Sequence, residues 1–375
     1  MFKTKAVSSS FASKSPRQTR RRLLKAALAG VVAAPAWQLA LAQPAVVRSR
    51  ALEKELVFSS RGGTIGTVWR TKVIPPFEEK FNCKVTSLVS DSVPALAKVL
   101  AERANPQVDV LWSTDQSHVQ GKVHGAFDKL DFDRVPNAAQ CYPFARNPEG
   151  IGMTWSVGGC VIEYNARIYK EKGIAPPTSW NDIFTPQTKG RVGWLDLSTL
   201  QGITAFLMLN KLQGGNEANV GPGFRFMKAQ LPHMVGMVSS PSQLDDLFQQ
   251  NEAWIAANVD GRVLALKRRN FPVEMVHARE GVPQVGVRLE LIKGAKHPNL
   301  AHEFINWVLS PGVQAIVATE MGLGPVNRNT NVDAKVAENI IFGAERMSKL
   351  VQFDYNVVVR DFTNWIDRWN RELSR

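Results

Sequence analysis

The stretch that decides the fold is Leu56–Thr67, which reads LVFSSRGGTIGT. It begins as a short apolar β run and then changes to small polar residues. Gly62 and Gly63 permit positive φ and let the backbone come close to a ligand, while Thr64 is placed to cap the helical stretch that follows. A strand that ends in such a turn is where open α/β sheets usually bind ligands. The stretch alone is equally compatible with an ordinary strand-to-helix connection.

Strands and helices alternate along the first half of the chain. The predicted strands are 55–58, 84–89 and 108–112, and the predicted helices between them are 64–81, with a break at Pro75-Pro76, and 93–104. This alternation predicts a parallel sheet with helical crossovers. Between residues 142 and 165, glycines separate two strand-like runs, 153–157 and 160–164, with no helix between them. Successive strands of this kind suggest a crossing into a second lobe.

The second half repeats the alternation. The predicted strands are 192–195, 254–259, 273–276 and 288–292; the predicted helices are 168–172, 203–212, 224–231, one opened by Ser240-Pro241, 298–309, 311–320 and a helical tail over 331–375. Asp260-Gly261 is expected to end the strand 254–259 in a turn. Pro298 and Pro311 stand in the first turn of their helices, where proline is favoured.

The N-terminal region reads as an export signal. Residues 1–42 carry eight of the 46 Lys and Arg residues and no acid, so the net charge of +13 falls to +5 without them. Thr19–Lys25, TRRRLLK, closely resembles the twin-arginine export signal, and an apolar run ends in the small-residue site Ala40-Leu41-Ala42. We predict a signal peptide at 1–42 and a periplasmic mature chain; a retained amphipathic anchor is the alternative. The basic charge therefore gives no reason to expect nucleic-acid binding.

The cysteines and the missing motifs argue against catalysis. Cys83, Cys141 and Cys160 match no metal-ligand spacing. Cys141 and Cys160 would pair in an oxidising compartment, or all three would stay as buried thiols. The sequence has no His-Glu-x-x-His, Gly-x-Ser-x-Gly, phosphate-binding Gly-x-x-x-x-Gly-Lys or Cys-x-x-Cys motif. No metal, cofactor or catalytic residue is predicted.

What recurs instead is a strand that ends in small polar, acidic or aromatic residues. The candidate ligand-binding residues are Ser59, Arg61, Gly62, Thr64, Trp112, Ser113, Thr114, Asp115, Trp155, Asp196, Ser198, Thr199, Asp260 and Glu280. In a two-lobed α/β protein such strand ends converge on the cleft. The acids and the two tryptophans would make a box for an organic cation. The same residues also have structural interpretations: the tryptophans as core, Asp196 as a helix cap and Asp260 as a turn residue.

Arg61 does not fit a cation box. It would grip a carboxylate or phosphate beside a helix N-terminus, or pair with one of the acids across the cleft.

The chain resembles the periplasmic solute-binding proteins of ABC importers, in the branch that includes polyamine, thiamine, phosphonate and ferric-iron binders. The matching stretches are LVFSS at 56–60, IPPFE at 74–78, NPQVDV at 105–110, YN at 164–165, YKEKGIAPPTSW at 169–180, DGR at 260–262, EG at 280–281, KGAKHP at 293–298, FIN at 304–306, LSP at 309–311 and GPVN at 324–327. Each motif is moderately specific, whereas their order and coverage are strongly specific.

The resemblance implies a type II, two-lobed α/β fold, each lobe a mixed sheet flanked by helices and joined by a hinge. We expect lobe 1 to comprise 43–157 plus 260–297, and lobe 2 to comprise 158–259 plus 298–375. It also implies a monomer that captures a small solute and delivers it to an inner-membrane permease. Iron binders of this branch carry adjacent tyrosines, which this chain lacks.

Polyamine or thiamine is the favoured solute, although the first loop lacks the aromatic residue of polyamine binders. An anionic solute held by Arg61, such as a phosphonate, sugar phosphate or carboxylate, is the alternative. Two further alternatives are an exported thiaminase-like enzyme with Cys160 as nucleophile and a periplasmic sensor module with the same ligand chemistry.

Overall fold

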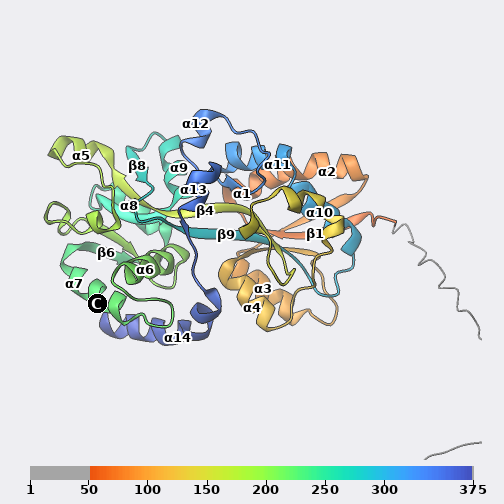
Figure 1. The fold of residues 1–375 in the computed structure, drawn as a ribbon, viewed down its shortest axis with the longest axis horizontal. Coiled ribbons are helices and arrows are strands. Elements are labelled where there is room, and N and C mark those ends of the chain that lie inside the picture. The colour runs from red at the N-terminus through yellow and green to blue at the C-terminus, as the bar shows by residue number, and fades with distance from the viewer. Residues whose placement is uncertain (1–50, 374–375) are drawn as a thin grey trace, which may run out of the picture. The chain divides into compact units, whose positions relative to one another are not determined.

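An eleven-stranded mixed sheet runs through residues 51–373, the part of the chain that the computed structural model describes. The strands of its main path follow the order β2-β1-β3-β9-β4-β7-β5-β6. Helices cover the sheet on both sides; in Figure 1, α10 and α11 lie above β1 and β9, while α3 and α4 lie below them. The predicted signal peptide, 1–42, lies outside the described residues.

The first half contains a parallel three-strand unit. Its strands are β1 (Glu55–Ser60), β2 (Lys84–Val89) and β3 (Val110–Thr114), and its helices are α1 (Gly63–Val68), α2 (Ile74–Phe81), α3 (Ser92–Ala101) and α4 (Asp115–Val123). The expected break at Pro75-Pro76 is wrong. A π-helical turn, Trp69–Val73, joins α1 to α2, and a proline occupies the start of α2, where a missing N–H costs little.

Two long antiparallel strands connect the halves. β4 (Met153–Asn165) is one strand of 13 residues where two runs were expected, and β9 (Val282–Leu291) begins six residues earlier than the predicted 288. β4 pairs with β9 through residues 153–159 and with β7 and β8 through residues 160–165. The glycines at 158 and 159 thus belong to a continuous crossing strand.

The second half completes the sheet. Its strands are β5 (Val192–Leu195), β6 (Met234–Val238), β7 (Ile255–Val259) and β8 (Val273–Val276), with the short strands β10 (Gly324–Pro325) and β11 (Leu350–Val351). Its helices are α5 (Ala166–Lys172), α6 (Leu200–Leu212), α7 (Gly221–Gln230), α8 (Pro241–Gln249), α9 (Asp260–Arg268), α10 (Pro298–Val308), α11 (Pro311–Ile316) with a π turn at Val317–Met321, α12 (Ala334–Ala337), α13 (Gly343–Ser348) and α14 (Tyr355–Glu372). The prediction missed α4, α9 and β6, and the expected turn at Asp260-Gly261 is the first turn of α9.

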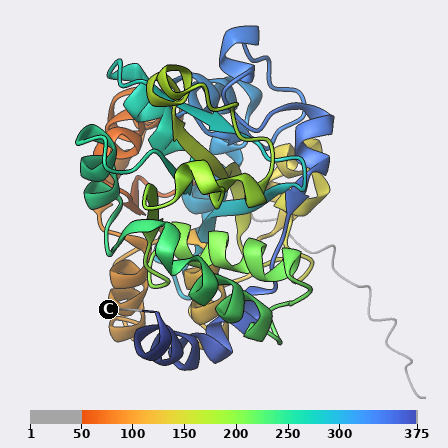
Figure 2. The same cartoon turned by 90° about the vertical axis from the view of Figure 1, so that its left-hand side faces the viewer.

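Large apolar cores lie on either side of the crossing strands. One surrounds Phe58, Trp69 and Trp155, and another surrounds Trp180 and Trp369. Residues 298–375, which were expected in the second lobe, divide between the two cores. α10 and α11 pack into the first core, and α14 packs into the second. Figures 1 and 2 both show α14 beneath the helices of the second half. The fold is therefore a two-lobed α/β fold, and the exact lobe boundaries stay a prediction.

Candidate functional site

A cavity of about 270 Å³ lies at the junction of the two halves. We call it the junction cavity. Its walls come from α4, from the loop around Asn147, from β9 and from the segment Gln352–Asn356 that opens α14. Elements from both sides of the crossing strands therefore meet at one polar cavity.

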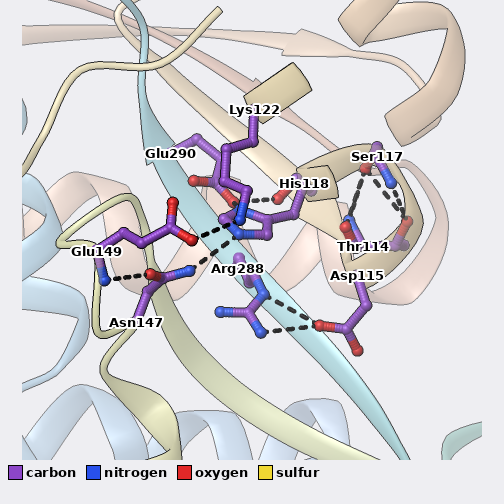
Figure 3. Close-up of polar contacts among 10 residues, drawn as sticks. Thr114, Asp115, Ser117, His118, Lys122, Asn147, Glu149, Arg288 and Glu290 are labelled. Atoms are coloured by element: carbon purple, nitrogen blue, oxygen red, sulfur yellow. Dashed lines mark hydrogen bonds and ion pairs between the residues drawn. The ribbon is translucent and has the colours of Figure 1, made fainter. Parts of the chain in front are cut away.

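An ion pair between Asp115 and Arg288 forms one wall of the junction cavity. Oδ1 of Asp115 accepts a hydrogen bond from Nε of Arg288 at 3.0 Å and forms an ion pair with Nη2 at 3.0 Å (Figure 3). Oδ2 of Asp115 accepts from the N–H of Gly286 at 3.1 Å. Asp115 is the first residue of α4, whose N-terminus is capped by Thr114 together with Ser117. The cap fixes the direction of the Asp115 side chain, and that side chain in turn fixes the guanidinium.

A buried network lies behind this pair. Oε1 of Glu290 accepts from Ser113 Oγ at 2.7 Å and from His118 Nδ1 at 2.9 Å. Asn147 uses its carbonyl oxygen to accept from the N–H of Glu149, so its amide N–H donates to Nε2 of His118 at 3.1 Å (Figure 3). His118 is therefore the Nδ1–H tautomer. The network ties the Asn147 loop to α4 and β9.

Tyr355 reaches the junction cavity from α14. The residue is 8% exposed, and its buried hydroxyl has the side chain of Thr204 as a neighbour, in a contact outside standard hydrogen-bond geometry. Burial raises the pKa of this hydroxyl well above its usual value and the nearby Asp115 carboxylate raises it further, although the contact with Thr204 lowers it. Tyr355 is thus a neutral hydrogen-bond donor beside the Asp115–Arg288 pair.

The two tryptophans of the expected cation box lie in the core. Trp155 is fully buried and meets Trp69 edge to face at 4.9 Å, and Trp112 is 3% exposed in the same core. Each has the packing role that was its alternative interpretation. Their ring faces are consequently not displayed at the junction cavity.

The candidate site residues expected in lobe 2 form hydrogen bonds with backbone groups close to them in the chain. Asp196 accepts from the N–H of Ser198, and Thr199 caps α6 by accepting from the N–H of Gly202. Asp196 also lines a separate cavity of about 680 Å³ along β6. These residues shape the strand end after β5, and none of them lines the junction cavity.

Two further acids lie in different places. Asp260 is 1% exposed and accepts from the N–H groups of Gly159 and Gly261; burial raises the pKa of its carboxyl to about 7, although these hydrogen bonds lower it. Glu280 holds Ser179 and the N–H of Trp180, so it fixes a loop of the second half. Neither side chain lines the junction cavity.

The first loop has one exposed cation. Arg61 lies 3.6 Å from Asp91, and its guanidinium sits 5.8 Å from the centre of the Trp112 ring. Gly62 stands at the N-cap of α1 without a side-chain cap, Thr64 is exposed in the first turn, and Ser59 is buried in β1. Of the fourteen predicted site residues, Asp115 alone lines the junction cavity, and Thr114 caps the helix that carries it.

The sequence prediction missed the cavity residues of β9 and α14. Gln284, Gly286, Arg288 and Glu290 alternate with apolar residues, and this period of two placed one polar face on β9. That alternation was a usable signal. Tyr355 had none, because its position depends on how α14 packs against α4.

Residues 51–373 show neither a metal-binding cluster nor an activated cysteine. No three His, Cys, Asp or Glu side chains between residues 51 and 373 cluster in a way that could hold a metal ion. All three cysteines are free, which decides against the Cys141–Cys160 pair. Burial raises the pKa of the Cys160 thiol, with a smaller contribution from Asp260, so the thiolate that a nucleophile needs is disfavoured. Within residues 51–373, no helix combines the length and apolar character that a bilayer crossing requires.

Comparisons with known proteins identify the family of the chain and its relatives in fold. Residues 72–344 match the family described as bacterial extracellular solute-binding protein. An ABC transporter structure from Clostridium perfringens has a TM-score of 0.75 and 24% identity, with coverage of 85% of this chain and 99% of its own. A putative extracellular solute-binding protein from Bordetella parapertussis has a TM-score of 0.74 and 21% identity, with coverage of 86% and 99%. The periplasmic binding protein AfuA from Actinobacillus pleuropneumoniae, described with fructose-6-phosphate bound, has a TM-score of 0.68 and 20% identity, with coverage of 86% and 99%.

Proposed function

The chain belongs to the bacterial extracellular solute-binding proteins, and we propose that it captures its solute in the junction cavity and carries it through the periplasm as a monomer, without catalysis. Proteins of this family are the extracytoplasmic solute-binding components of ABC transporters. They bind small solutes and deliver them to a membrane permease.

The observation that supports the site is that elements from both sides of the crossing strands line the cavity. Asp115 and Arg288 contribute from α4 and β9, while Tyr355 contributes from α14, which packs into the second core. A ligand that touches both sides stabilises the arrangement in which they are close together. The cavity volume of about 270 Å³ suits a small polar metabolite.

The polarity of the wall bears on the kind of solute. The favoured organic cation, a polyamine or thiamine, loses support because Trp112 and Trp155 lie in the core. It also loses support because Asp115 and Asp260 already accept two or more hydrogen bonds each. An anionic solute held by Arg61 retains an exposed guanidinium, which lies outside the lining of the junction cavity.

A thermal-shift screen of the mature protein tests the proposal. The screen contains spermidine, thiamine, amino acids, phosphonates and sugar phosphates. A solute at about 100 times its Kd should stabilise the protein by about 2.7 kcal/mol. Turnover of the stabilising compound, detected by mass spectrometry and abolished by Cys160→Ser, would instead favour an enzyme.

Two matched tryptophan substitutions test whether the solute binds in the junction cavity or elsewhere on the surface. Asn356→Trp places a large side chain at the exposed first turn of α14, beside the junction cavity. Asn364→Trp makes the same change at another exposed position of α14, outside the cavity lining. We expect the first variant to lose the thermal shift and the second to keep it. Equal binding by both variants would place the solute elsewhere.

A further inference from the structure

We infer that the junction cavity binds an acidic group of its solute, a carboxylate or a phosphate, on the free edge of the Arg288 guanidinium. This inference rests on the proposed function and specifies the solute class. It differs from the sequence-based anion hypothesis, which placed the acidic group on Arg61. It depends on which hydrogen-bond donors around the cavity already have an acceptor and which do not.

Arg288 is held firmly but uses only part of its hydrogen-bonding capacity. Asp115 takes Nε and Nη2, and the third guanidinium nitrogen points away from Asp115 (Figure 3). The Arg288 side chain is only 15% exposed, and Nη1 has no hydrogen-bond partner in residues 51–373. A largely buried guanidinium with unused N–H groups favours an acceptor that brings its own negative charge.

A second unused donor lies in the same wall. Gln284, two residues before Gly286 on the same face of β9, uses its carbonyl oxygen to accept from Gln352 Nε2 at 2.9 Å, which leaves its own amide N–H groups unused. Gly286 lies between Gln284 and Arg288, and the Asp115 carboxylate occupies the space above it, since a Cβ at Gly286 would lie 2.7 Å from Oδ2 of Asp115.

The acids of the wall do not compete for this edge. Asp115 accepts from Arg288 and Gly286, Glu149 pairs with Lys122 at 2.7 Å, and Asp354 accepts from the backbone and side-chain nitrogens of Asn356, each at 2.9 Å. Every carboxylate that lines the cavity thus has a partner. Arg288 and Gln284 both keep unused donors, so an oxyanion accepts hydrogen bonds at this edge, whereas an ammonium group would be repelled by Arg288.

Matched ligands and variants test the inference. Fructose 6-phosphate and fructose, and 4-aminobutyrate and its methyl ester, differ in the acidic group, while spermidine and thiamine represent cations. Their Kd values are measured by calorimetry on solute-free protein, and metabolites that leave the cell with the purified protein are identified by mass spectrometry. The variants are Arg288→Gln, Arg288→Lys, Arg61→Gln and, as a control, Arg262→Gln, which breaks the 2.9 Å pair with Asp245 outside the cavity.

The expected result is a bound solute with a carboxylate or phosphate group. Arg288→Gln should raise its Kd roughly tenfold to a hundredfold and remove the preference over the uncharged analogue, with Arg288→Lys between the two. The Kd of Arg262→Gln should stay within about threefold of the wild-type value. This control shows whether the loss of any Arg–Asp pair is enough to weaken binding.

Three results would overturn the inference while leaving solute binding intact: a solute without an acidic group, an unchanged Kd in Arg288→Gln, or a loss of affinity in Arg61→Gln alone. Failure of every tested compound to bind, with no metabolite carried by the purified protein, would overturn the proposed function and the inference with it.

Discussion

Oδ2 of Asp260 accepts a hydrogen bond of 2.8 Å from the backbone N–H of Gly159, which ties the first residue of α9 to the crossing strand β4. Oδ1 of the same carboxylate accepts from the N–H of Gly261 at 2.7 Å. Asp260 therefore joins the second half to the strand that both halves share. At the other end of α9, Arg268 donates to the carbonyls of Thr319 and Glu320, which follow α11 of the first core.

Removal of the Asp260 carboxylate should destabilise the fold. Asp260→Ala leaves the buried N–H of Gly159 and the partly buried N–H of Gly261 without their acceptor, which should lower the free energy of unfolding by about 1–3 kcal/mol. Asp246→Ala is the control, since Asp246 is exposed on α8 and should change stability by less than about 0.5 kcal/mol. Equal denaturant midpoints for the two variants would contradict the role of Asp260.

Buried Glu163 should make stability fall as the pH rises. Its ordinary pKa of 4.5 is raised by burial to about 7, although the hydrogen bond from Asn258 lowers it. Between these two values the folded chain keeps a proton that the unfolded chain has lost, so raising the pH favours unfolding by at most about 1.4 kcal/mol per pH unit. The contribution is constant above the folded pKa. Asp260, with a pKa of about 7 in the fold against 3.8, acts in the same direction.

Glu163→Gln should remove part of that slope. Urea unfolding at several pH values between 4 and 8 measures it, and the variant should gain stability relative to the wild type as the pH rises. Glu345→Gln serves as the control because Glu345 is fully exposed on α13. Parallel curves for wild type and Glu163→Gln would show that Glu163 stays ionised in the fold.

Gly159 should not tolerate a side chain. A Cβ there would lie 2.3 Å from Cγ1 of Val282 and 2.8 Å from Cδ1 of Ile341. Gly159→Ala should therefore cost about 1–3 kcal/mol through overpacking of the crossing strands. Gly312→Ala is the matched control: it lies in α11 with nothing within 4 Å of a new Cβ, and it should stabilise by up to about 1 kcal/mol. Thermal unfolding that ranks the two variants in the opposite order would contradict this packing.

Trp155 should act on stability and not on ligand choice. The ring is fully buried against Trp69, so Trp155→Ala should lower the free energy of unfolding by about 3–5 kcal/mol. Trp155→Phe keeps most of the apolar volume and should leave solute affinity unchanged in calorimetry. A selective loss of spermidine or thiamine binding in Trp155→Phe would restore the aromatic cation box.

The cysteines should be unreactive in the native protein. Burial raises the pKa of Cys141 to about 12, and it also raises the pKa of Cys160. We expect a thiol reagent at pH 8 to label half-buried Cys83 first and to reach the other two only after unfolding. A mass two units lower, restored by reduction, would instead reveal a Cys141–Cys160 disulfide in the exported protein.

The sequence by itself determined the class of fold and the family. Alternating strands and helices predicted the α/β sheet, with β2, β5 and β8 at their observed bounds, because buried strands and amphipathic helices leave different periods in the chain. These local patterns can be recognised in the sequence without knowledge of which elements pack together. It also placed candidate polar residues at strand ends, including Asp115.

The tertiary structure alone decided which of those residues face a common cavity. Trp155 and Asp115 both read as cleft residues, yet Trp155 enters the core and Asp115 pairs with Arg288, more than 170 residues later. A strand side chain points to one of two opposite faces, and the choice depends on what covers each face. The junction cavity exists because α14 packs near α4, a long-range contact that no local pattern encodes.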